Sequence, residues 1–154
     1  MTALLSKNAK KAIGVEIVPE AVECANELAQ MNSLQDKITN YLGKCEDIVP
    51  DIIAKERAEG NKVCLVLDPP RKGCDKKVLD AILSVKPQKI VYVSCSPQTL
   101  ARDLGMLCGT LYYDGNELKK SLEINGVYKI TKVQPYDMFP QTKHVETLVC
   151  LERV

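Results

Sequence analysis

Two acidic residues and one cysteine lie at the ends of short apolar segments, where the strands of an open α/β sheet present groups to ligands. The first acid is Glu16, near the end of the apolar segment 12–18. Its carboxylate is placed to accept hydrogen bonds from both ribose hydroxyls of a nucleotide-like cofactor. An isolated acid beside a turn is more often only a solvated side chain, so Glu16 by itself is weak evidence for a site.

The second acid is Asp68, which opens the sequence DPPRKG at residues 68–73. It follows a strongly apolar segment, and the two prolines after it stiffen the loop. A stiff loop would hold Asp68 and Arg71 in fixed directions, as preorganised binding requires. The alternative interpretation is a rigid connector that binds nothing.

The cysteine is Cys95, in the sequence SCSPQTLARD at residues 94–103. It ends an apolar segment, and Ser96 and Pro97 predict the cap and first residue of a helix. The free amides and the dipole at a helix N-terminus favour a thiolate, which is the nucleophilic form of cysteine. Buried structural cysteines are instead expected at three other positions: Cys24, Cys64 and Cys150.

Alternating strands and helices are predicted to position these residues. Short apolar segments rich in β-branched residues predict strands of a parallel sheet covered on both faces: 12–18, 37–43, 62–68 and 89–95. Helical segments follow them: 19–32, 46–58, 75–85 and 97–108. The first helix is expected to present one apolar face: Ala21, Cys24, Ala25 and Leu28. The order predicts a right-handed α/β sandwich.

The C-terminal segment breaks this alternation. Residues 128–139 and 145–154 read as two strands joined by a short polar turn, so they are expected to pair antiparallel at the edge of the sheet. Parallel strands that end in an antiparallel hairpin are similar to the methyltransferase variant of the doubly wound fold. We expect one domain over residues 1–154.

Composition narrows the class of protein. Lys and Arg total 21 against 20 acidic residues, so net charge is no argument for a nucleic-acid partner. No apolar run reaches the roughly 20 residues that span a bilayer, and we expect a cytoplasmic protein without membrane contact. The seven cysteines show no metal-like spacing. Reduced thiols and no metal site are therefore expected.

Three motifs together resemble the uracil-5-methyltransferases of transfer and ribosomal RNA. They are DPPRKG, VYVSCSPQT at residues 91–99 and YDMFPQTKHVE at residues 136–146. The resemblance covers nearly the whole chain. It implies a Rossmann-like S-adenosyl-L-methionine-dependent methyltransferase fold, and methylation of carbon 5 of a uridine in RNA, with 23S ribosomal RNA favoured over transfer RNA.

The resemblance also implies catalytic roles for two residues. Cys95 would add to carbon 6 of uracil and make carbon 5 nucleophilic enough to attack the methyl group of the cofactor. Glu146 would then remove the proton on carbon 5, which frees the thiolate. The alternative for Glu146 is a surface acid at the end of a strand.

Further residues match the family by position. Glu16 corresponds to the acid that holds the cofactor ribose, and Asp68 to an acid near the methionine part of the cofactor. Four supporting residues are expected to orient RNA or a catalytic loop: Arg71, Thr99, Arg102 and His144.

The sequence also departs from the family. No glycine-rich turn precedes Glu16, and neither the RNA-binding domain nor the cysteine cluster for an iron–sulfur centre is present, so the chain resembles an N-terminally incomplete catalytic domain and is expected to be inactive by itself. Lys44 stands where an acid often contacts adenine. Residues 109–126 resemble an insertion and are expected to form a solvated loop or short helix, or else to contact RNA.

Two other functions remain as alternatives. The chain would be a truncated, inactive fragment that acts at most as an interaction module, or it would methylate a DNA cytosine or a small molecule. The segment 136–146 argues against the last of these, because it resembles the RNA uracil family specifically.

Overall fold

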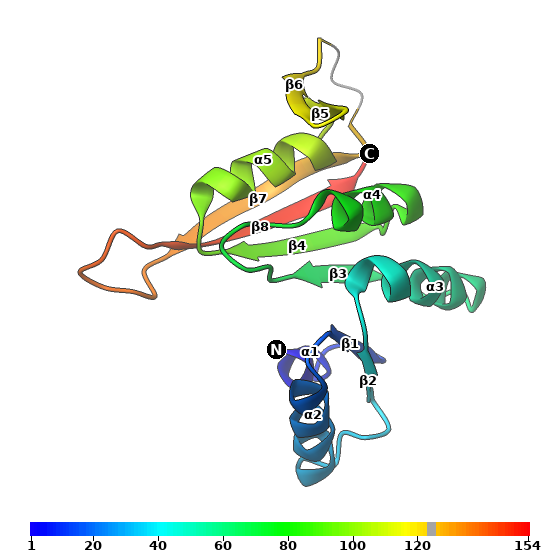
Figure 1. Ribbon diagram of the computed structural model, residues 1–154. Helices are drawn as coiled ribbons and strands as arrows, with labels where there is room; N and C mark the ends of the chain where they lie inside the picture. The colour runs from blue at the N-terminus through cyan, green and yellow to red at the C-terminus, as the bar shows by residue number, and fades with distance from the viewer. Residues whose placement is uncertain (123–125) are drawn as a thin grey trace. The chain divides into compact units, whose positions relative to one another are not determined.

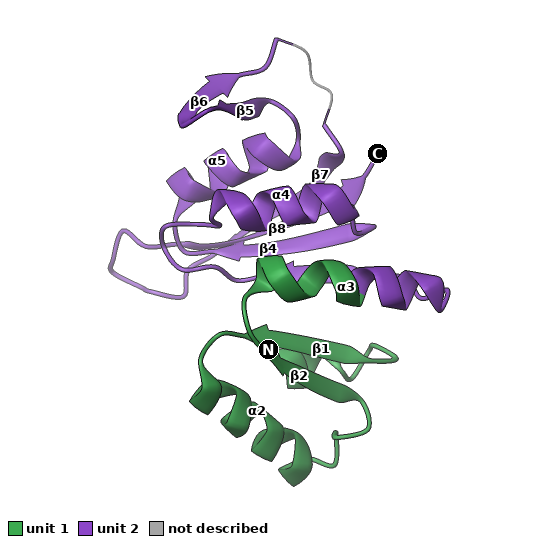
Figure 2. Ribbon diagram, turned by 45° about the vertical axis from the view of Figure 1, so that its right-hand side comes forward, with its two compact units in different colours: residues 1–52 green, residues 53–154 purple. Residues whose placement is uncertain are grey.

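The fold is organised around two parallel pairs of strands, one in each of two compact units (Figure 1). The computed structural model describes residues 1–122 and 126–154. Unit 1 comprises Met1–Ile52 and unit 2 comprises Ile53–Val154 (Figure 2). No helix among the described residues is long and apolar enough to cross a membrane. The expected single domain over the whole chain stays a prediction.

In unit 1, a parallel pair of strands packs against the helix that connects them and against the short first helix. The elements follow in the order α1 (Thr2–Leu5), β1 (Ala12–Glu16), α2 (Pro19–Met31) and β2 (Ile38–Leu42). β1 and β2 pair along their whole length, as their β-branched apolar sequences predict. Ala12, Ala29 and Ile38 form the buried core of the unit. α3 (Cys45–Ala58) begins in unit 1 and ends in unit 2.

The buried face of α2 differs from the predicted one. Val22 and Ala29 are buried, whereas Cys24 is exposed and Leu28 is 49% exposed. The helix is therefore turned by about one residue, or roughly 100°, relative to the prediction. Helical spacing alone allowed either stripe, and the packing of Ala29 with the β1–β2 core selects the one observed.

Unit 2 contains a four-stranded mixed sheet and two helices. Its elements after α3 are β3 (Cys64–Leu67), α4 (Lys76–Val85), β4 (Lys89–Ser94), α5 (Pro97–Leu107), β5 (Leu111–Asp114), β6 (Glu117–Lys120), β7 (Tyr128–Tyr136) and β8 (Glu146–Arg153). The strand order is β3-β4-β8-β7. β3 and β4 are parallel, and β8 pairs antiparallel with both β4 and β7. The predicted C-terminal antiparallel hairpin is confirmed.

α4 and α5 cover one face of this sheet (Figure 1). Burial alternates along β4 and β8, as it does in strands with one covered face. Tyr92, Val149 and Leu151 point to the helices and are fully buried there with Leu79 and Leu107. Burying a side chain of the size of Val or Leu stabilises the fold by about 1.5–3 kcal/mol.

Residues 111–120 form a β-hairpin, so the prediction of a solvated loop or short helix is wrong there. β5 and β6 pair antiparallel, with Gly115 and Asn116 between the paired ends Asp114 and Glu117. A two-residue Gly-Asn connection is a hairpin turn signal, and it lies between segments of extended sequence. The rest of the predicted insertion includes residues 123–125, which lie outside the described residues.

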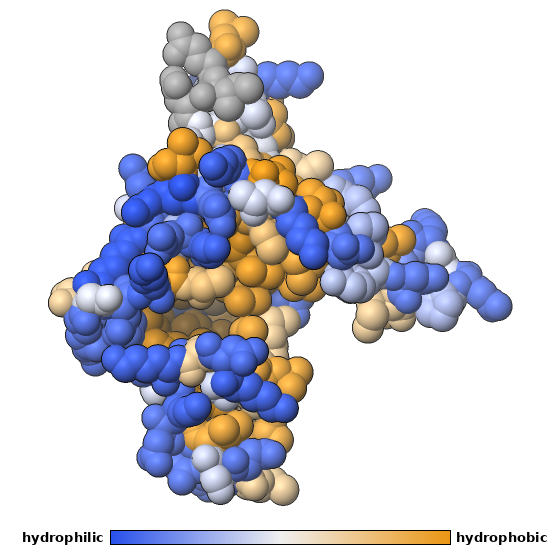
Figure 3. All heavy atoms as spheres, turned by 180° about the vertical axis from the view of Figure 1, so that it is seen from behind, coloured by the Kyte–Doolittle hydropathy of each residue, from blue (hydrophilic) through white to orange (hydrophobic). Residues whose placement is uncertain are grey.

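The three cysteines expected to be buried are not buried. Cys24 and Cys64 are exposed and Cys150 is half-buried. Cys64 lies on the sheet face opposite α4 and α5, because its neighbour Leu65 packs into the core on the helix side. Seen from behind, hydrophobic side chains are visible on the surface of the molecule (Figure 3). Short apolar segments thus predicted the strands, but helices were expected on both faces of the sheet, and α4 and α5 cover only one face of it.

Candidate active site

Asp68 and Cys95 lie at the same edge of the unit 2 sheet. β3 ends at Leu67 and β4 ends at Ser94, and each of the two functional residues comes directly after its strand. Because the two strands are parallel, with Leu67 opposite Tyr92, their carboxyl ends meet at one edge. This is the edge at which open α/β sheets bind ligands.

Glu146 begins β8 beside the end of β4. Ser94 pairs with Thr147 in the antiparallel ladder, so Cys95 and Glu146 each stand one residue beyond that last pair. Ser94 and Thr147 are buried, whereas Cys95 and Glu146 are half-buried. The register therefore brings a thiol and a carboxylate, 51 positions apart in the sequence, to the same end of two neighbouring strands.

The turn that carries Cys95 is held by Ser94. The amide of Ser96 donates to Ser94 Oγ at 3.1 Å, and Ser94 Oγ donates to the Ser96 carbonyl at 3.2 Å. Ser96 is the N-cap residue of α5 and Pro97 its first residue, as predicted, although the side chain of Ser96 does not cap the helix. Ser94 could not be recognised from the sequence, because its role depends on the geometry of this turn.

Other thiols of the chain are less suited to act as nucleophiles. Burial raises the pKa of Cys45, and the carboxylates of Glu46 and Glu16 add to that effect. Burial also raises the pKa of Cys108. Because the thiolate is the reactive form, both side chains are less reactive near neutral pH than an ordinary cysteine.

Thr99 and Arg102 hold the segment that follows Asp68. Thr99 Oγ1 donates to the carbonyl of Arg71 at 3.0 Å, and Arg102 Nη2 donates to the carbonyls of Lys72 at 3.0 Å and Cys74 at 3.1 Å. The two side chains are thus engaged with a loop of the protein itself. Arg71 is exposed on this loop.

A third α5 residue, Asp103, takes part in the same contacts and was not recognised from the sequence. Arg102 forms an ion pair with Asp103, whose side chain is fully buried. We call Thr99, Arg102 and Asp103 the α5 clamp, and residues 68–75 the DPPRKG loop. The sequence LARD gave no signal for this role, because the loop that the clamp holds lies about one strand and one helix earlier in the chain.

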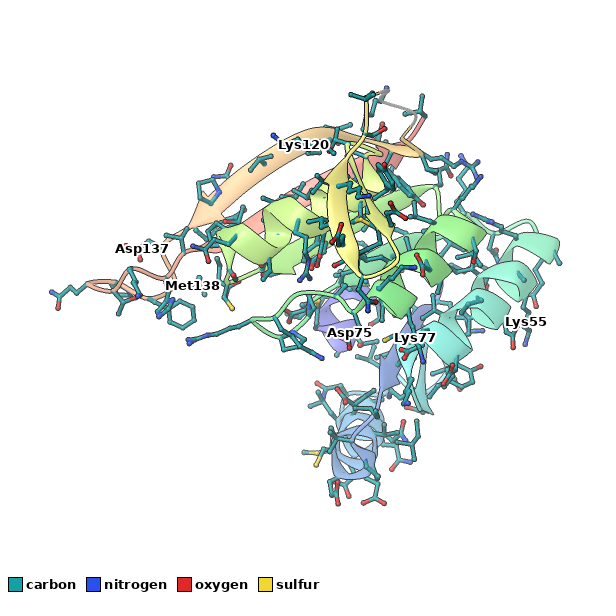
Figure 4. The ribbon with its side chains drawn as sticks, turned by 45° about the horizontal axis from the view of Figure 1, so that its top comes forward. Lys55, Asp75, Lys77, Lys120, Asp137 and Met138 are labelled. Atoms are coloured by element: carbon teal, nitrogen blue, oxygen red, sulfur yellow. The ribbon has the colours of Figure 1, made fainter. Side chains whose placement is uncertain are left out.

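His144 lies in the loop between β7 and β8, two residues before Glu146. Its ring makes an edge-to-face contact with Phe139, with the ring centroids 6.4 Å apart. Phe139 and Met138 are 43% and 64% exposed. Figure 4 shows Asp137 and Met138 on this loop, which projects beyond the ends of the strands. The predicted strand 128–139 ends earlier than expected, at Tyr136.

Glu16 lies at the carboxyl end of β1 in unit 1. Its Oε1 accepts hydrogen bonds from the amides of Ile17 at 2.7 Å and Val18 at 3.0 Å, which fixes the carboxylate at the start of α2. The side chain is exposed. Asp68 and Cys95 share one edge of the unit 2 sheet, and we predict that Glu16 serves the same site.

Comparison with known proteins gives the family and the fold. The model of the tRNA (uracil-5-)-methyltransferase family matches residues 60–154, more than half of the chain. An uncharacterized RNA methyltransferase of Clostridium acetobutylicum is 44% identical over the whole chain, and one of Listeria monocytogenes is 44% identical over 96% of it. The chain spans 29% and 28% of the lengths of these relatives.

Solved structures show the same architecture. The tRNA (uracil-54, C5)-methyltransferase of Pyrococcus abyssi, in complex with S-adenosyl-L-homocysteine, is 25% identical with a TM-score of 0.68 over 96% of this chain and 30% of its own. Streptococcus pneumoniae Sp1610, in complex with S-adenosyl-L-methionine, has a TM-score of 0.67 at 12% identity over 99% of this chain and 60% of its own. The predicted Rossmann-like methyltransferase fold is confirmed, and the chain belongs to the tRNA (uracil-5-)-methyltransferase family.

Proposed function

We propose that this chain is the catalytic part of an S-adenosyl-L-methionine-dependent enzyme that methylates carbon 5 of a uridine in ribosomal or transfer RNA. The observation that carries the proposal is the placement of Cys95 beside Glu146 at the carboxyl edge that also holds Asp68. A nucleophile and a general base on neighbouring strand ends are what covalent activation of a pyrimidine requires.

The reaction begins with Cys95. Its thiolate adds to carbon 6 of uracil, so a sulfur–carbon bond forms and the electrons of the double bond between carbons 5 and 6 move into an enolate. The turn fixed by Ser94 presents the sulfur at the start of α5. When bound, S-adenosyl-L-methionine would supply the methyl group for carbon 5, with its methyl–sulfur bond breaking and S-adenosyl-L-homocysteine left as the second product.

Glu146 completes the reaction. Its carboxylate takes the remaining proton from carbon 5, and the electrons of that bond restore the double bond and expel the thiolate of Cys95. Both side chains are half-buried, so they are accessible to a base that has been turned out of its stack.

Two acids fit the expected cofactor. Glu16 and Asp68 are exposed, and each lies at the carboxyl end of a parallel strand pair. Glu16 has Oε2 in addition to the oxygen that holds its own turn, and a carboxylate accepts well from ribose hydroxyls. The negative charge of Asp68 would attract the cationic methionine end of the cofactor. Glu16 would hold the ribose and Asp68 would lie near the methionine part.

RNA is the proposed partner, and two features of the catalytic edge support it. Arg71 is exposed on the DPPRKG loop and can pair with a phosphate. Met138 and Phe139 are exposed on the loop that leads to Glu146, where flat or flexible apolar side chains can contact unstacked bases.

The experiment that tests the proposal uses a chimaera in which this chain replaces the matching segment of the Clostridium acetobutylicum relative. The chimaera is incubated with S-adenosyl-L-methionine and either unmodified ribosomal RNA or unmodified transfer RNA, and the nucleosides are analysed by mass spectrometry. We expect 5-methyluridine in one of the two RNAs. Methylation of cytidine, or of neither RNA by a folded chimaera while the unchanged relative is active, would contradict the proposal.

The 154-residue chain is the second arm of the experiment. We expect it to be inactive by itself, because it spans less than a third of the length of its relatives. A folded chimaera without activity would favour the alternative, an inactive fragment that acts at most as an interaction module.

A further inference from the structure

A fully buried carboxylate, that of Asp103, connects three elements near the catalytic edge. Asp103 Oδ2 accepts from the amide of Cys74 at 2.7 Å and from the hydroxyl of Tyr92 at 2.5 Å. Asp103 Oδ1 accepts from Arg102 Nε at 2.8 Å. The side chain is 0% exposed, so the energy of removing its charge from water must be offset by these donors.

The donors come from parts of the chain that carry the site. Tyr92 belongs to β4, three residues before Cys95, and Cys74 belongs to the DPPRKG loop that opens with Asp68. Asp103 itself lies on α5, which begins two residues after Cys95. One carboxylate therefore connects the strand before the nucleophile, the helix after it and the loop beside it.

The α5 clamp holds the loop by its backbone. Thr99, Arg102 and Asp103 lie at helical spacing on one side of α5, and they bond four groups of the loop backbone. These groups are the carbonyls of Arg71, Lys72 and Cys74 and the amide of Cys74. Contacts with backbone groups fix the path of a loop, whatever side chains it carries.

The contact between loop and clamp is close. Gly73 has φ +76°, and a Cβ placed on it would lie 2.6 Å from Asp103 Oδ2 and 2.7 Å from Arg102 Nη2. A loop at this distance cannot shift toward the helix. Asp103 and Arg102 meanwhile prevent it from moving away, so the position of the loop is fixed in both directions.

We propose that Asp103 is a positioning residue that sets the DPPRKG loop, and with it Asp68 and Arg71, against the turn that carries Cys95. This proposal rests on the proposed function for its effect on the rate, but not for its effect on the loop. Asp103 is buried away from any substrate, so it acts only through the residues it holds.

The pKa shifts of two side chains that donate to Asp103 agree with this role. Burial lowers the pKa of Arg102, but the hydrogen bond and the charge of Asp103 outweigh burial and raise it. Burial and the hydrogen bond to Asp103 raise the pKa of Tyr92, so its hydroxyl stays protonated and remains a donor.

The first test measures the loop in the 154-residue chain, and it needs no activity. Amide hydrogen exchange is compared in Asp103→Asn, in Tyr92→Phe and in the control Asp80→Asn, which alters an exposed ion pair on α4. We expect exchange of residues 71–74 to rise at least about tenfold in Asp103→Asn, less in Tyr92→Phe, and not in the control, while β8 stays protected. Unchanged exchange in the loop of both Asp103→Asn and Tyr92→Phe would overturn the proposal.

Tyr92→Phe covers the case in which Asp103→Asn fails to fold. It keeps the aromatic ring in the core and removes only the hydroxyl that donates to Asp103. Faster exchange of the loop in this variant alone supports the proposal, and equal exchange overturns it.

The second test measures chemistry in the chimaera. RNA with 5-fluorouridine is used. Fluorine replaces the hydrogen on carbon 5, so a base has no proton to remove there and the covalent adduct accumulates. The single-turnover rate of adduct formation is taken per folded molecule. We expect Asp103→Asn to reduce this rate about 100-fold with little change in RNA affinity, as misplacement of reacting groups does.

A purely structural role would give a different result. It would reduce the folded fraction and leave the rate per folded molecule unchanged, and that outcome overturns the positioning role. If the unaltered chimaera forms no adduct, the proposed function fails instead, and the exchange measurement still decides the proposal for Asp103.

Discussion

Replacement of Gly73 by alanine tests how closely the α5 clamp holds the DPPRKG loop. A left-handed backbone costs a residue with a Cβ about 1–2 kcal/mol. At Gly73 the Cβ would also contact two atoms of the clamp, Asp103 Oδ2 and Arg102 Nη2, at 2.6 and 2.7 Å. Hydrogen bonds to charged groups are worth about 1.5–3 kcal/mol each, and the contact would weaken at least one. We therefore expect Gly73→Ala to lower the free energy of unfolding by about 2.5–5 kcal/mol.

Gly60 is a matched control for this substitution. It has nearly the same backbone angle, φ +77°, but a Cβ on it would meet no atom within 4 Å. Gly60→Ala should lower the free energy of unfolding by only the backbone cost of about 1–2 kcal/mol. Urea unfolding of both variants at one temperature measures the difference. Equal losses in the two variants would show that the clamp does not contact the loop as closely as described.

Three further expectations concern the core, alkaline pH and the cofactor. Leu151→Ala, at a fully buried position, should cost about 2–5 kcal/mol in urea unfolding, whereas Leu122→Ala, at an exposed one, should cost almost nothing. Burial raises the pKa of Tyr128 to about 12. An unfolded tyrosine ionises near pH 10. The stability that depends on a protonated Tyr128 is therefore fully present below about pH 10 and is lost between about pH 10 and 12, at about 1.4 kcal/mol per pH unit. The free energy of unfolding should fall less steeply with alkaline pH in Tyr128→Phe, and an unchanged slope would count against the burial of this hydroxyl. Calorimetry should find weak or no binding of S-adenosyl-L-methionine to the 154-residue chain, because no glycine-rich turn precedes Glu16 in it, and micromolar affinity would show that such a turn is dispensable.

The sequence predicted the strands of the fold well, because their signal is local. Segments 62–68 and 89–95 are apolar at nearly every position and became β3 and β4. Once two such strands are parallel, Asp68 and Cys95 must lie at one edge, so that part of the site also followed from the sequence. Local periodicity did not fix the rotation of α2, since Leu28 and Ala29 are both apolar and only packing distinguishes them.

Features that depend on distant residues were harder to predict. The hairpin at 111–120 is an exception, because Gly115-Asn116 is a local turn signal, but the polar sequence around it also fits a loop or short helix. The position of Glu146 beside Cys95 came from family resemblance, because only the register of β4 with β8 places them together. Asp103 gave no signal at all, since its donors Cys74 and Tyr92 lie 29 and 11 positions away in the sequence.

Covalent capture of RNA by Cys95 and its release by Glu146 test the central claim most directly. In the chimaera, denaturing gels with labelled RNA and S-adenosyl-L-methionine compare Cys95→Ala, Glu146→Gln and the control Cys64→Ala, which replaces an exposed cysteine on β3. We expect Cys95→Ala to form neither adduct nor methylated RNA, and Cys64→Ala to be as active as the parent. Glu146→Gln should accumulate a methylated covalent adduct, because methyl transfer precedes removal of the proton. Normal turnover in Glu146→Gln, or RNA still captured by Cys95→Ala, would contradict the assigned roles.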